Sequence, residues 1–227
     1  MAGVQPLHDE AAAHAKRLSK FSTSTVSDAL DRFHINGGLE GILPVVDGMK
    51  VCGPAFTVRY IPVDQSRKGR VFTYIDDVKK GDVVVVDNGG RTYCTTWGDL
   101  LTRKALRLGL AGTVVYGACR DVDTIRKLAY PVFSKGRFMM TGKDRVEVES
   151  TGQPVTVGDV RVSPLDIILG DSSGVVCVPY SKAREVQTAA EEISASEEGI
   201  ALAVDSGASL KDARTKFGYE KLQRPKE

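Results

Sequence analysis

The segment 81–121 constrains the fold of this chain more than any other part of the sequence. It opens with the run Val83–Val86, and an apolar run without alternation is typical of a strand that is buried on both faces. A helical segment begins near Gly98, and a second apolar run follows at 113–116. This order predicts a parallel βαβ unit within an α/β fold. We expect the helix to face the sheet with its apolar stripe, Leu100, Leu101, Ala105 and Leu108.

Polar residues follow the elements of this unit at the edge where both strands end. The loop after Asp87, the helix start at Gly98 and the pair Arg120-Asp121 emerge at the carboxyl edge of the sheet, where open α/β sheets bind ligands. A helix start attracts anions, and Arg120 offers a fork that matches a carboxylate or phosphate. Asp99 and Asp121 offer oxygen ligands that suit Mg²⁺ or Mn²⁺. Asp99 alone is explained by the helix dipole and Arg120-Asp121 alone by a solvated ion pair, so only their convergence indicates a functional site.

Composition and charge argue against several classes of protein. The formal net charge is +2 and no basic block stands out, which argues against a nucleic-acid or membrane-surface partner. No apolar run approaches the roughly 20 residues of a membrane span, and the first residues lack the pattern of a signal peptide. The four cysteines, Cys52, Cys94, Cys119 and Cys177, are widely separated and indicate reduced thiols. We therefore expect a cytoplasmic protein.

The remaining segments predict helices at both ends and strands between them, within a single domain 1–227. The expected elements are an N-terminal helical segment 7–33 with a capping box at Thr25-x-x-Asp28, a strand at 51–61, a β-rich segment at 143–180, and C-terminal helices over about 182–217 that begin at an N-cap Ser181. The histidines, His8, His14 and His34, lie outside the central unit, so we expect them on the surface or in helix packing and not in catalysis.

A motif in the central unit resembles the RraA-like family. The residues that carry the resemblance are Asp99-x20-Arg120-Asp121, with Gly89-Gly90 and Trp97-Gly98 before them and Leu100-Leu101 after Asp99. More narrowly, they resemble the class II pyruvate aldolases typified by 4-hydroxy-4-methyl-2-oxoglutarate aldolase. The RNase-E-inhibitor members of the family do not keep the acidic residue after the arginine, so Asp121 favours the aldolase branch.

The resemblance implies a fold and a set of roles. The fold is an αββα-type sandwich related to the swivelling β/β/α domain, with a central parallel βαβ unit and a long C-terminal helix. Asp121 binds a divalent metal, Mg²⁺ or Mn²⁺, and Asp99 holds a water that the metal binds. Arg120 binds the oxygens of a 2-oxo acid and stabilises its enolate, while the backbone amides of Leu100 and Leu101, at the helix start after Gly98, hold the substrate carboxylate.

The family also takes a glutamate from the C-terminal helix of a neighbouring subunit. We assign Glu197 to this role, with Glu198 and Glu192 as rivals, although a solvated glutamate on a helix face explains Glu197 almost as well. A glutamate supplied in this way implies a homotrimer or a homohexamer.

These roles predict a lyase that cleaves a 4-hydroxy-2-oxo acid to pyruvate and also decarboxylates oxaloacetate, because both reactions pass through one enolate. One alternative is a non-catalytic regulator that binds an RNA-processing enzyme. Another is a metal-dependent dehydratase or isomerase of sugar acids on the same site. We expect the segments 62–70 and 134–145 to distinguish among substrates, since their lysines and arginines suit a second carboxylate or a phosphate, although both also fit plain exposed loops.

Overall fold

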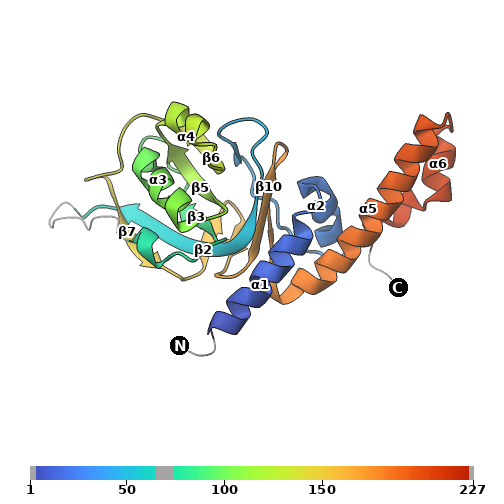
Figure 1. The fold of residues 1–227 in the computed structure, drawn as a ribbon, viewed down its shortest axis with the longest axis horizontal. Coiled ribbons are helices and arrows are strands. Elements are labelled where there is room, and N and C mark those ends of the chain that lie inside the picture. The colour runs from blue at the N-terminus through green and yellow to red at the C-terminus, as the bar shows by residue number, and fades with distance from the viewer. Residues whose placement is uncertain (1–3, 65–73, 225–227) are drawn as a thin grey trace.

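The computed structural model describes residues 4–64 and 74–224 (Figure 1). Short helical turns lie at Tyr74–Asp77, Tyr180–Lys182 and Tyr219–Lys221. The other elements, in chain order, are α1 (Val4–Leu18), α2 (Thr23–Asp31), β1 (Leu43–Pro44), β2 (Val51–Pro62), β3 (Val83–Asp87), β4 (Thr95–Trp97), α3 (Asp99–Leu108), β5 (Gly112–Cys119), α4 (Val122–Leu128), β6 (Val132–Arg137), β7 (Val146–Thr151), β8 (Val155–Val157), β9 (Val160–Val162), β10 (Ile167–Asp171), β11 (Gly174–Val178), α5 (Ala183–Asp205) and α6 (Leu210–Lys216).

The main sheet is built on the predicted βαβ unit. Strands β3 and β5 are parallel neighbours, in register from Val83 opposite Gly112 to Asp87 opposite Tyr116, and α3 connects them. The strand order is β1-β6-β5-β3-β2-β10-β11, in which β2, β3, β5 and β6 run parallel. Gly38, just before β1, forms a bridge to Val176 of β11, so the two ends of this order meet and the sheet nearly closes on itself.

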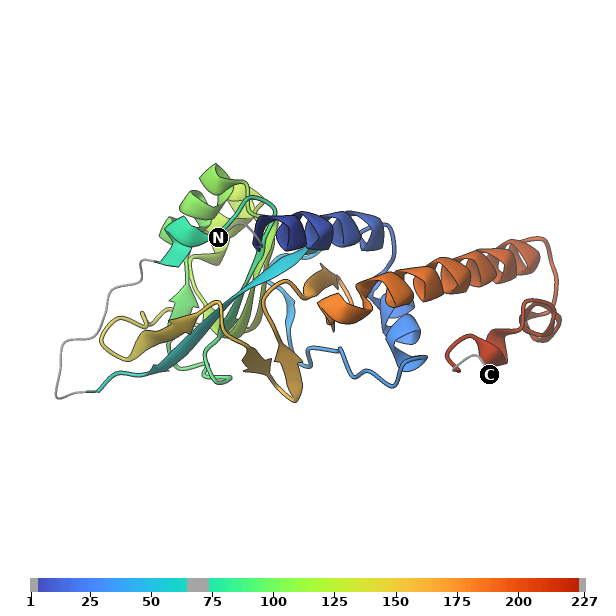
Figure 2. The same ribbon diagram turned by 90° about the horizontal axis from the view of Figure 1, so that it is seen from below.

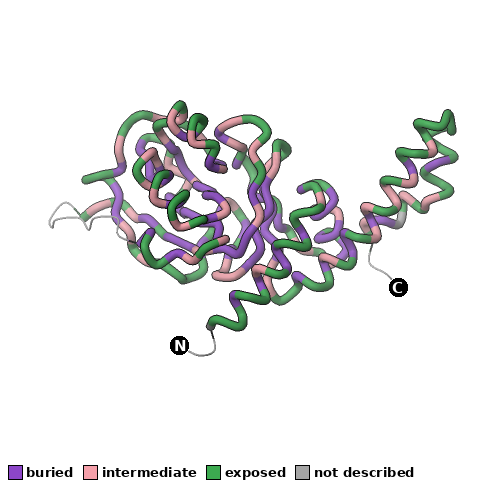
Figure 3. Tube along the Cα trace, viewed as in Figure 1, coloured by how far each residue is buried: buried purple, intermediate pink, exposed green. Residues whose placement is uncertain are grey.

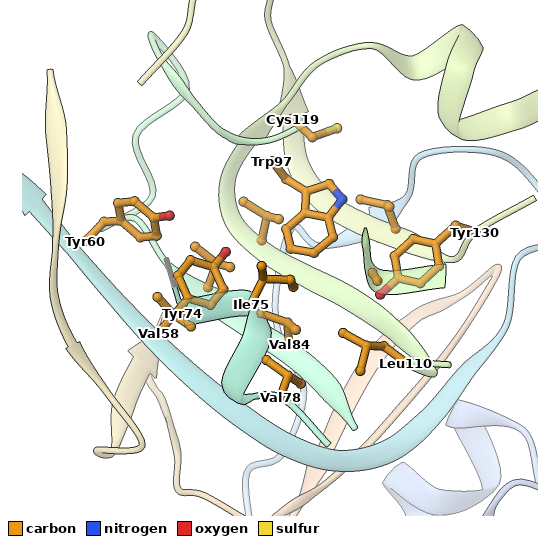
Figure 4. Packing of buried hydrophobic residues seen from close by; sticks show 14 of the residues in the cluster. Val58, Tyr60, Tyr74, Ile75, Val78, Val84, Trp97, Leu110, Cys119 and Tyr130 are labelled. Carbon is orange, nitrogen blue, oxygen red and sulfur yellow. The ribbon is translucent and has the colours of Figure 1, made fainter. Parts of the chain in front are cut away.

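Helices cover the strands on two sides, as the expected sandwich requires. Helices α3 and α4 lie over one side of the parallel strands (Figures 1 and 2). On the other side, α1 lies against β2 and β10, α2 lies against β10 and β11, and α5 packs on α1 and α2. Beneath α3 and α4, the rings of Trp97 and Tyr130 stack with their centroids 6.2 Å apart in a cluster of buried residues (Figure 4). These large rings and the valines of β3 and β5 exclude water from the underside of α3.

The C-terminal helices form an arm that extends away from the sheet (Figure 2). The first part of α5 is anchored by buried residues such as Val186 and Ile193, but the far part is largely exposed (Figure 3). There Leu202 is 68% exposed and Val204 is 38% exposed, so the end of α5 presents apolar side chains to solvent. Helix α6 folds back along α5, where the ring of Phe217 lies against Gly199.

Some helix starts differ from the sequence expectations. Helix α2 begins at Thr23 and not at Thr25, because the Ser22 hydroxyl caps it by accepting a hydrogen bond from the Thr25 N–H. Similarly, α5 follows a helical turn at Tyr180–Lys182, and Ser181 is not its cap. The histidines agree with the expectation: His8 and His14 are buried on α1, where Nε2 of His8 lies 2.6 Å from Oδ1 of buried Asp82, and His34 is exposed.

Helix α3 and the loop 62–70 also bear on the sequence expectations. The predicted apolar stripe of α3 is wrong at Leu100, which is 75% exposed. Leu101, Ala105 and Leu108 share the side that packs on the buried cluster, and Leu100 lies about 100° around the helix from Leu101. Most of the predicted specificity loop 62–70 lies outside the described residues. Among the residues that the structure describes, no helix is both long enough and apolar enough to cross a membrane.

Candidate functional site

A pocket lies where β4 ends, α3 begins and β5 ends. It is lined by residues 95–101, by Arg120 and Asp121, and by Thr141 from the segment between β6 and β7. The structure thus brings together Gly98, Asp99, Leu100, Leu101, Arg120 and Asp121, all of which the sequence singles out. Their meeting at one sheet edge follows from the parallel pairing of β3 and β5 and from the position of α3 between them.

Strand β4 was missed by the sequence reasoning, which treated 88–97 as a loop. It pairs in parallel with the end of β5, with Thr95 opposite Ala118 and Trp97 opposite Cys119. Strand β4 therefore lies beside β5 beyond the point where β3 ends, and it places Gly98 at the edge of the sheet. The run Thr95-Thr96-Trp97 is β-branched and aromatic, a signal for a strand, but three residues are too short to show a period.

The first turn of α3 is fixed by a short chain of hydrogen bonds. The indole N–H of buried Trp97 donates to Oγ1 of Thr102 at 2.9 Å, and that hydroxyl donates to the carbonyl of Gly98 at 2.9 Å. The first N–H groups of a helix have no acceptor within the helix, so those of Leu100 and Leu101 are available to an anion in the pocket. The turn is thereby held in place before any ligand arrives.

Arg120 and Asp121 follow β5 and face this turn. The main-chain N–H of Asp99 donates to Oδ2 of Asp121 at 3.0 Å, and Nε of Arg120 lies 3.5 Å from the same oxygen. Asp121 has φ 57° and ψ 37°, a left-handed conformation that non-glycine residues seldom adopt and that is concentrated at functional sites. The Arg120 and Asp121 side chains are 40% and 35% exposed, so both can reach a ligand.

Gly98 provides space that another residue would fill. A Cβ added there would lie 2.7 Å from Oδ2 of Asp121 and 3.2 Å from Cγ of Arg120. The backbone of Gly98 is extended, so the reason for glycine is this close approach and not its conformation. The glycine therefore allows the carboxylate of Asp121 to sit directly against the start of the helix.

The pocket suits a hard divalent cation that keeps part of its water shell. Among the described residues, no three His, Cys, Asp or Glu side chains are grouped as a complete metal site. Mg²⁺, however, is usually bound by one or two carboxylates together with water and the oxygens of a substrate. Asp121 and Asp99 fit that set, although Oδ2 of Asp99 also lies 3.7 Å from Nε of Arg103.

Glu197 does not line this pocket within one chain. Its Oε2 accepts a hydrogen bond of 3.2 Å from Oγ1 of Thr25, and α5 lies on the opposite side of the molecule from α3 (Figures 1 and 2). Its rivals are also engaged: Glu192 pairs with Arg32 at 2.7 Å, and Glu198 accepts from Ser194 at 3.3 Å. A role for Glu197 in the pocket of a neighbouring subunit therefore stays a prediction.

The cysteine beside the pocket does not have the character of a nucleophile. Cys119 is fully buried at the end of β5, and burial raises the pKa of its thiol above the usual value, against weaker lowering by a contact with Ser134 and by the charge of Arg137. A thiol that stays protonated is a poor nucleophile. The groups of this pocket that can bind a charged ligand are its arginine, its carboxylates and the backbone amides at the start of α3.

The fold and the pocket define a class of mixed α/β protein in which an arginine and an aspartate face a helix start at the edge of a parallel sheet. The chain belongs to the RraA-like family, described as Aldolase/RraA, whose model matches residues 23–177. The sequence motif therefore pointed to the correct family.

Relatives of the chain include proteins with different names. DlpA from Legionella pneumophila is 43% identical over 209 residues; the match covers 90% of this chain, which spans only 34% of DlpA. A protein from Halalkalibacterium halodurans named "Putative 4-hydroxy-4-methyl-2-oxoglutarate aldolase" is 31% identical over 78% of this chain and 81% of its own length.

Solved structures support the same fold. An uncharacterized protein from Pseudomonas syringae pv. tomato has a TM-score of 0.83 and 40% identity, over 89% of this chain and 96% of its own. RraAS2 from Streptomyces coelicolor, described as an unusual member of the RNase ES inhibitor RraA protein family, has a TM-score of 0.75 and 30% identity, over 82% of this chain and 94% of its own.

Proposed function

We propose that this protein is a divalent-metal-dependent lyase that cleaves a 4-hydroxy-2-oxo acid to pyruvate and also decarboxylates oxaloacetate. The observation that carries this proposal is the position of Arg120 and Asp121 against the first turn of α3. Relatives that carry aldolase names support the choice of a lyase. Both reactions break a carbon–carbon bond and leave the enolate of pyruvate.

Different groups of the chain bind the substrate carboxylate and stabilise the charge on the oxo oxygen. The amides of Leu100 and Leu101 bind the carboxylate next to the oxo group, where the helix dipole adds to their attraction. The guanidinium of Arg120 donates to the oxo oxygen, and its interaction strengthens as negative charge develops there during bond cleavage. Interactions that strengthen in the transition state are those that accelerate a reaction.

Asp121, with Asp99, would hold Mg²⁺ or Mn²⁺ beside that oxygen. The bound cation supplies Lewis-acid stabilisation of the enolate. Asp99 additionally contributes an acceptor at the pocket mouth, where its carboxylate can orient a proton-carrying water. Because Asp121 accepts the N–H of Asp99, a cation there would be placed next to the bound substrate and not at a separate position.

We further infer that Glu197 completes the site of a neighbouring subunit in a homotrimer or homohexamer. Its position on the projecting arm, far from the pocket of its own chain, favours this arrangement. The exposed side chains of Leu202 and Val204 on the same helix would be covered by a second copy. The free cysteines suit the reducing conditions of the cytoplasm, where we place the protein.

The direct test measures pyruvate release from oxaloacetate and from 4-hydroxy-2-oxo acids in the presence of Mg²⁺ or Mn²⁺. Activity should be abolished by EDTA and restored by added metal, and Arg120→Ala and Asp121→Ala should each be inactive. Activity that survives the chelator, or that persists in Asp121→Ala, would rule out this assignment.

A second candidate function is suggested by one structural relative. RraAS2 from S. coelicolor is described within an RNase ES inhibitor family, and a regulator of this kind would bind an RNA-processing enzyme through its surface. Exposed apolar side chains near the pocket, Leu100 and Met139, would suit such a contact. Stable binding to such an enzyme that persists in Arg120→Ala, together with no pyruvate release from any 2-oxo acid, would favour the regulator.

A further inference from the structure

The arm of α5 and α6 has a base at which it joins the rest of the protein (Figure 2). Most buried residues of α5 lie in its first half, from Ala183 to Ile193, where they pack in one cluster with residues of α1 and α2. After Ile193 the next buried residue of the helix is Ile200. The contacts of the first half therefore set the direction in which the arm extends.

Arg32, directly after α2, joins the start and the end of the arm at this base. Its Nη1 donates a 2.7 Å hydrogen bond to Oε2 of Glu192, on the helix that leads into the arm. Its Nε donates to the carbonyl of Leu222, on the segment that returns after α6. The Arg32 side chain is only 7% exposed, and Leu222 is buried in the cluster that contains α2 and α5. One guanidinium thus holds three segments together.

A second contact between α2 and α5 involves Glu197 itself. Oγ1 of Thr25 donates to Oε2 of Glu197 at 3.2 Å. Along α2, Thr25 precedes Arg32, whereas along α5 their partners come in the reverse order, so the two helices run antiparallel and are joined at two points. The bond from Arg32 is the shorter of the two and joins two charged groups, which makes it the stronger contact.

The chemistry of arginine suits a residue that holds two acceptors at once. The N–H groups of a guanidinium lie in one plane and point in fixed directions, so two acceptors bound to them keep a fixed separation. Here those acceptors belong to the two segments that enter and leave the arm. Replacing Arg32 would release both segments from α2 and leave Thr25 as the remaining hydrogen bond to Glu197 from that helix.

We propose that Arg32 is a positioning residue that directs Glu197 toward the pocket of a neighbouring subunit by fixing the base of the arm. This inference rests on the proposed function, in which Glu197 completes that pocket. Arg32 does not line the pocket of its own chain, and its side chain is buried, so it acts through α5. A displacement of about 1 Å at a catalytic group can cost on the order of 100-fold in rate, so a small movement of α5 is sufficient.

Kinetics on single variants measures the effect of Arg32 on turnover. In Arg32→Gln, kcat for pyruvate release should fall about 10-fold or more while KM changes less than about 3-fold, because the substrate-binding groups of the pocket are unchanged. Glu192→Gln keeps the bond to Leu222 and should lose less activity, and adding it to Arg32→Gln should cause no further loss. Arg184→Gln, at an exposed site on the first turn of α5, is the matched control and should behave as the wild type.

Mixed assemblies show which chain carries the defect. Arg32→Gln and Arg120→Ala subunits that are refolded together should recover activity, because the second supplies an intact arm to the intact pocket of the first. Arg32→Gln with Glu197→Gln should not recover, because both arms are defective. If Arg32→Gln does not fold alone, Glu192→Gln replaces it in both mixtures. Recovery in the second mixture, or none in the first, would overturn the positioning role.

Hydrogen exchange separates this inference from the lyase assignment. The amides of residues 194–216 should exchange faster in Arg32→Gln than in the wild type or in Arg184→Gln, while those of β3 and β5 should not change. Faster exchange confined to the arm supports the anchoring by Arg32 even if the wild type releases no pyruvate and the lyase assignment falls. Unchanged exchange in the arm would overturn the role of Arg32, whatever the activity of the wild type.

Discussion

The main-chain N–H of Asp99 donates a 3.0 Å hydrogen bond to Oδ2 of Asp121, and this bond joins the first turn of α3 to the residue that begins α4. One carboxylate oxygen of Asp121 is therefore fixed against the start of α3. The other oxygen of Asp121 is left for a ligand. Any change that displaces this pair moves the two proposed halves of the site, the amides and the carboxylate, relative to each other.

Gly98→Ala should disable the pocket without unfolding the protein. The new methyl group would meet Oδ2 of Asp121 at 2.7 Å and force the carboxylate or the helix start to move. A displacement of about 1 Å in a catalytic arrangement can cost on the order of 100-fold in rate, so we expect at least that loss in oxaloacetate decarboxylation. Gly38→Ala is the matched control, since its added Cβ meets no atom within 4 Å. Wild-type activity in Gly98→Ala would contradict this account of the site.

Asp121→Asn should weaken the binding of Mn²⁺ while preserving the fold. The amide keeps the shape and can still accept the N–H of Asp99, but it lacks the negative charge that attracts a cation. Calorimetric titration with Mn²⁺ should show at least a 10-fold weaker affinity. Asp123→Asn is the control, because Asp123 is 89% exposed and pairs with Arg126. Equal Mn²⁺ affinity in both variants would remove Asp121 from the set of metal ligands.

Mixed assemblies should reveal whether Glu197 acts in a neighbouring subunit. Arg120→Ala and Glu197→Gln subunits, each inactive alone, should recover part of the wild-type activity when they are unfolded and refolded together. The hydroxyl of Thr25 donates to Glu197, so Thr25→Val should behave like Glu197→Gln and be complemented by Arg120→Ala, whereas Thr25→Ser should retain activity. Failure of Arg120→Ala and Glu197→Gln to complement each other would show that the glutamate is not shared.

Asp171 should make the stability of the protein depend on pH. Burial tends to raise the pKa of Asp171, but hydrogen bonds from the N–H and hydroxyl of Thr23 and from the N–H of Ser173 outweigh it and lower the pKa. A lowered pKa stabilises the fold above the unfolded value, near pH 4, and this stabilisation is lost as the pH falls through the folded pKa.

Asp171→Asn should therefore reduce the free energy of unfolding at pH 7 by about 1 kcal/mol, a figure kept small because the carboxylate is partly solvated. The difference from the wild type should stay nearly constant down to about pH 4 and shrink when urea unfolding is repeated below pH 4, as the pH falls through the lowered pKa of the folded protein. Asp159→Asn, at an exposed turn, should show no such dependence. A difference that stays constant with pH would mean that the charge of Asp171 is not responsible.

The sequence predicted the parts of the fold and site that depend on local pattern. The valines of β3, the helix after Gly98 and the Arg120-Asp121 pair follow from periodicity and topology, and the family followed from their spacing. Other features depend on contacts between distant segments. Strand β4 is stabilised by β5 and not by its own three residues, and the bond between Thr25 and Glu197 joins residues 172 positions apart.

Strand β2 couples the two ends of the molecule. Residues Val51–Pro54 pair with β10, whereas Ala55–Arg59 pair with β3, so one continuous backbone belongs both to the sheet beneath the pocket and to the hairpin that leads into the arm. Side chains alternate between the two faces of a strand. Deleting one residue at the junction would therefore move every side chain on one side of the deletion to the opposite face of the sheet. Insertions and deletions among relatives should therefore occur in the loops and not in β2. The distance between the pocket and the arm should accordingly be the same in all of them.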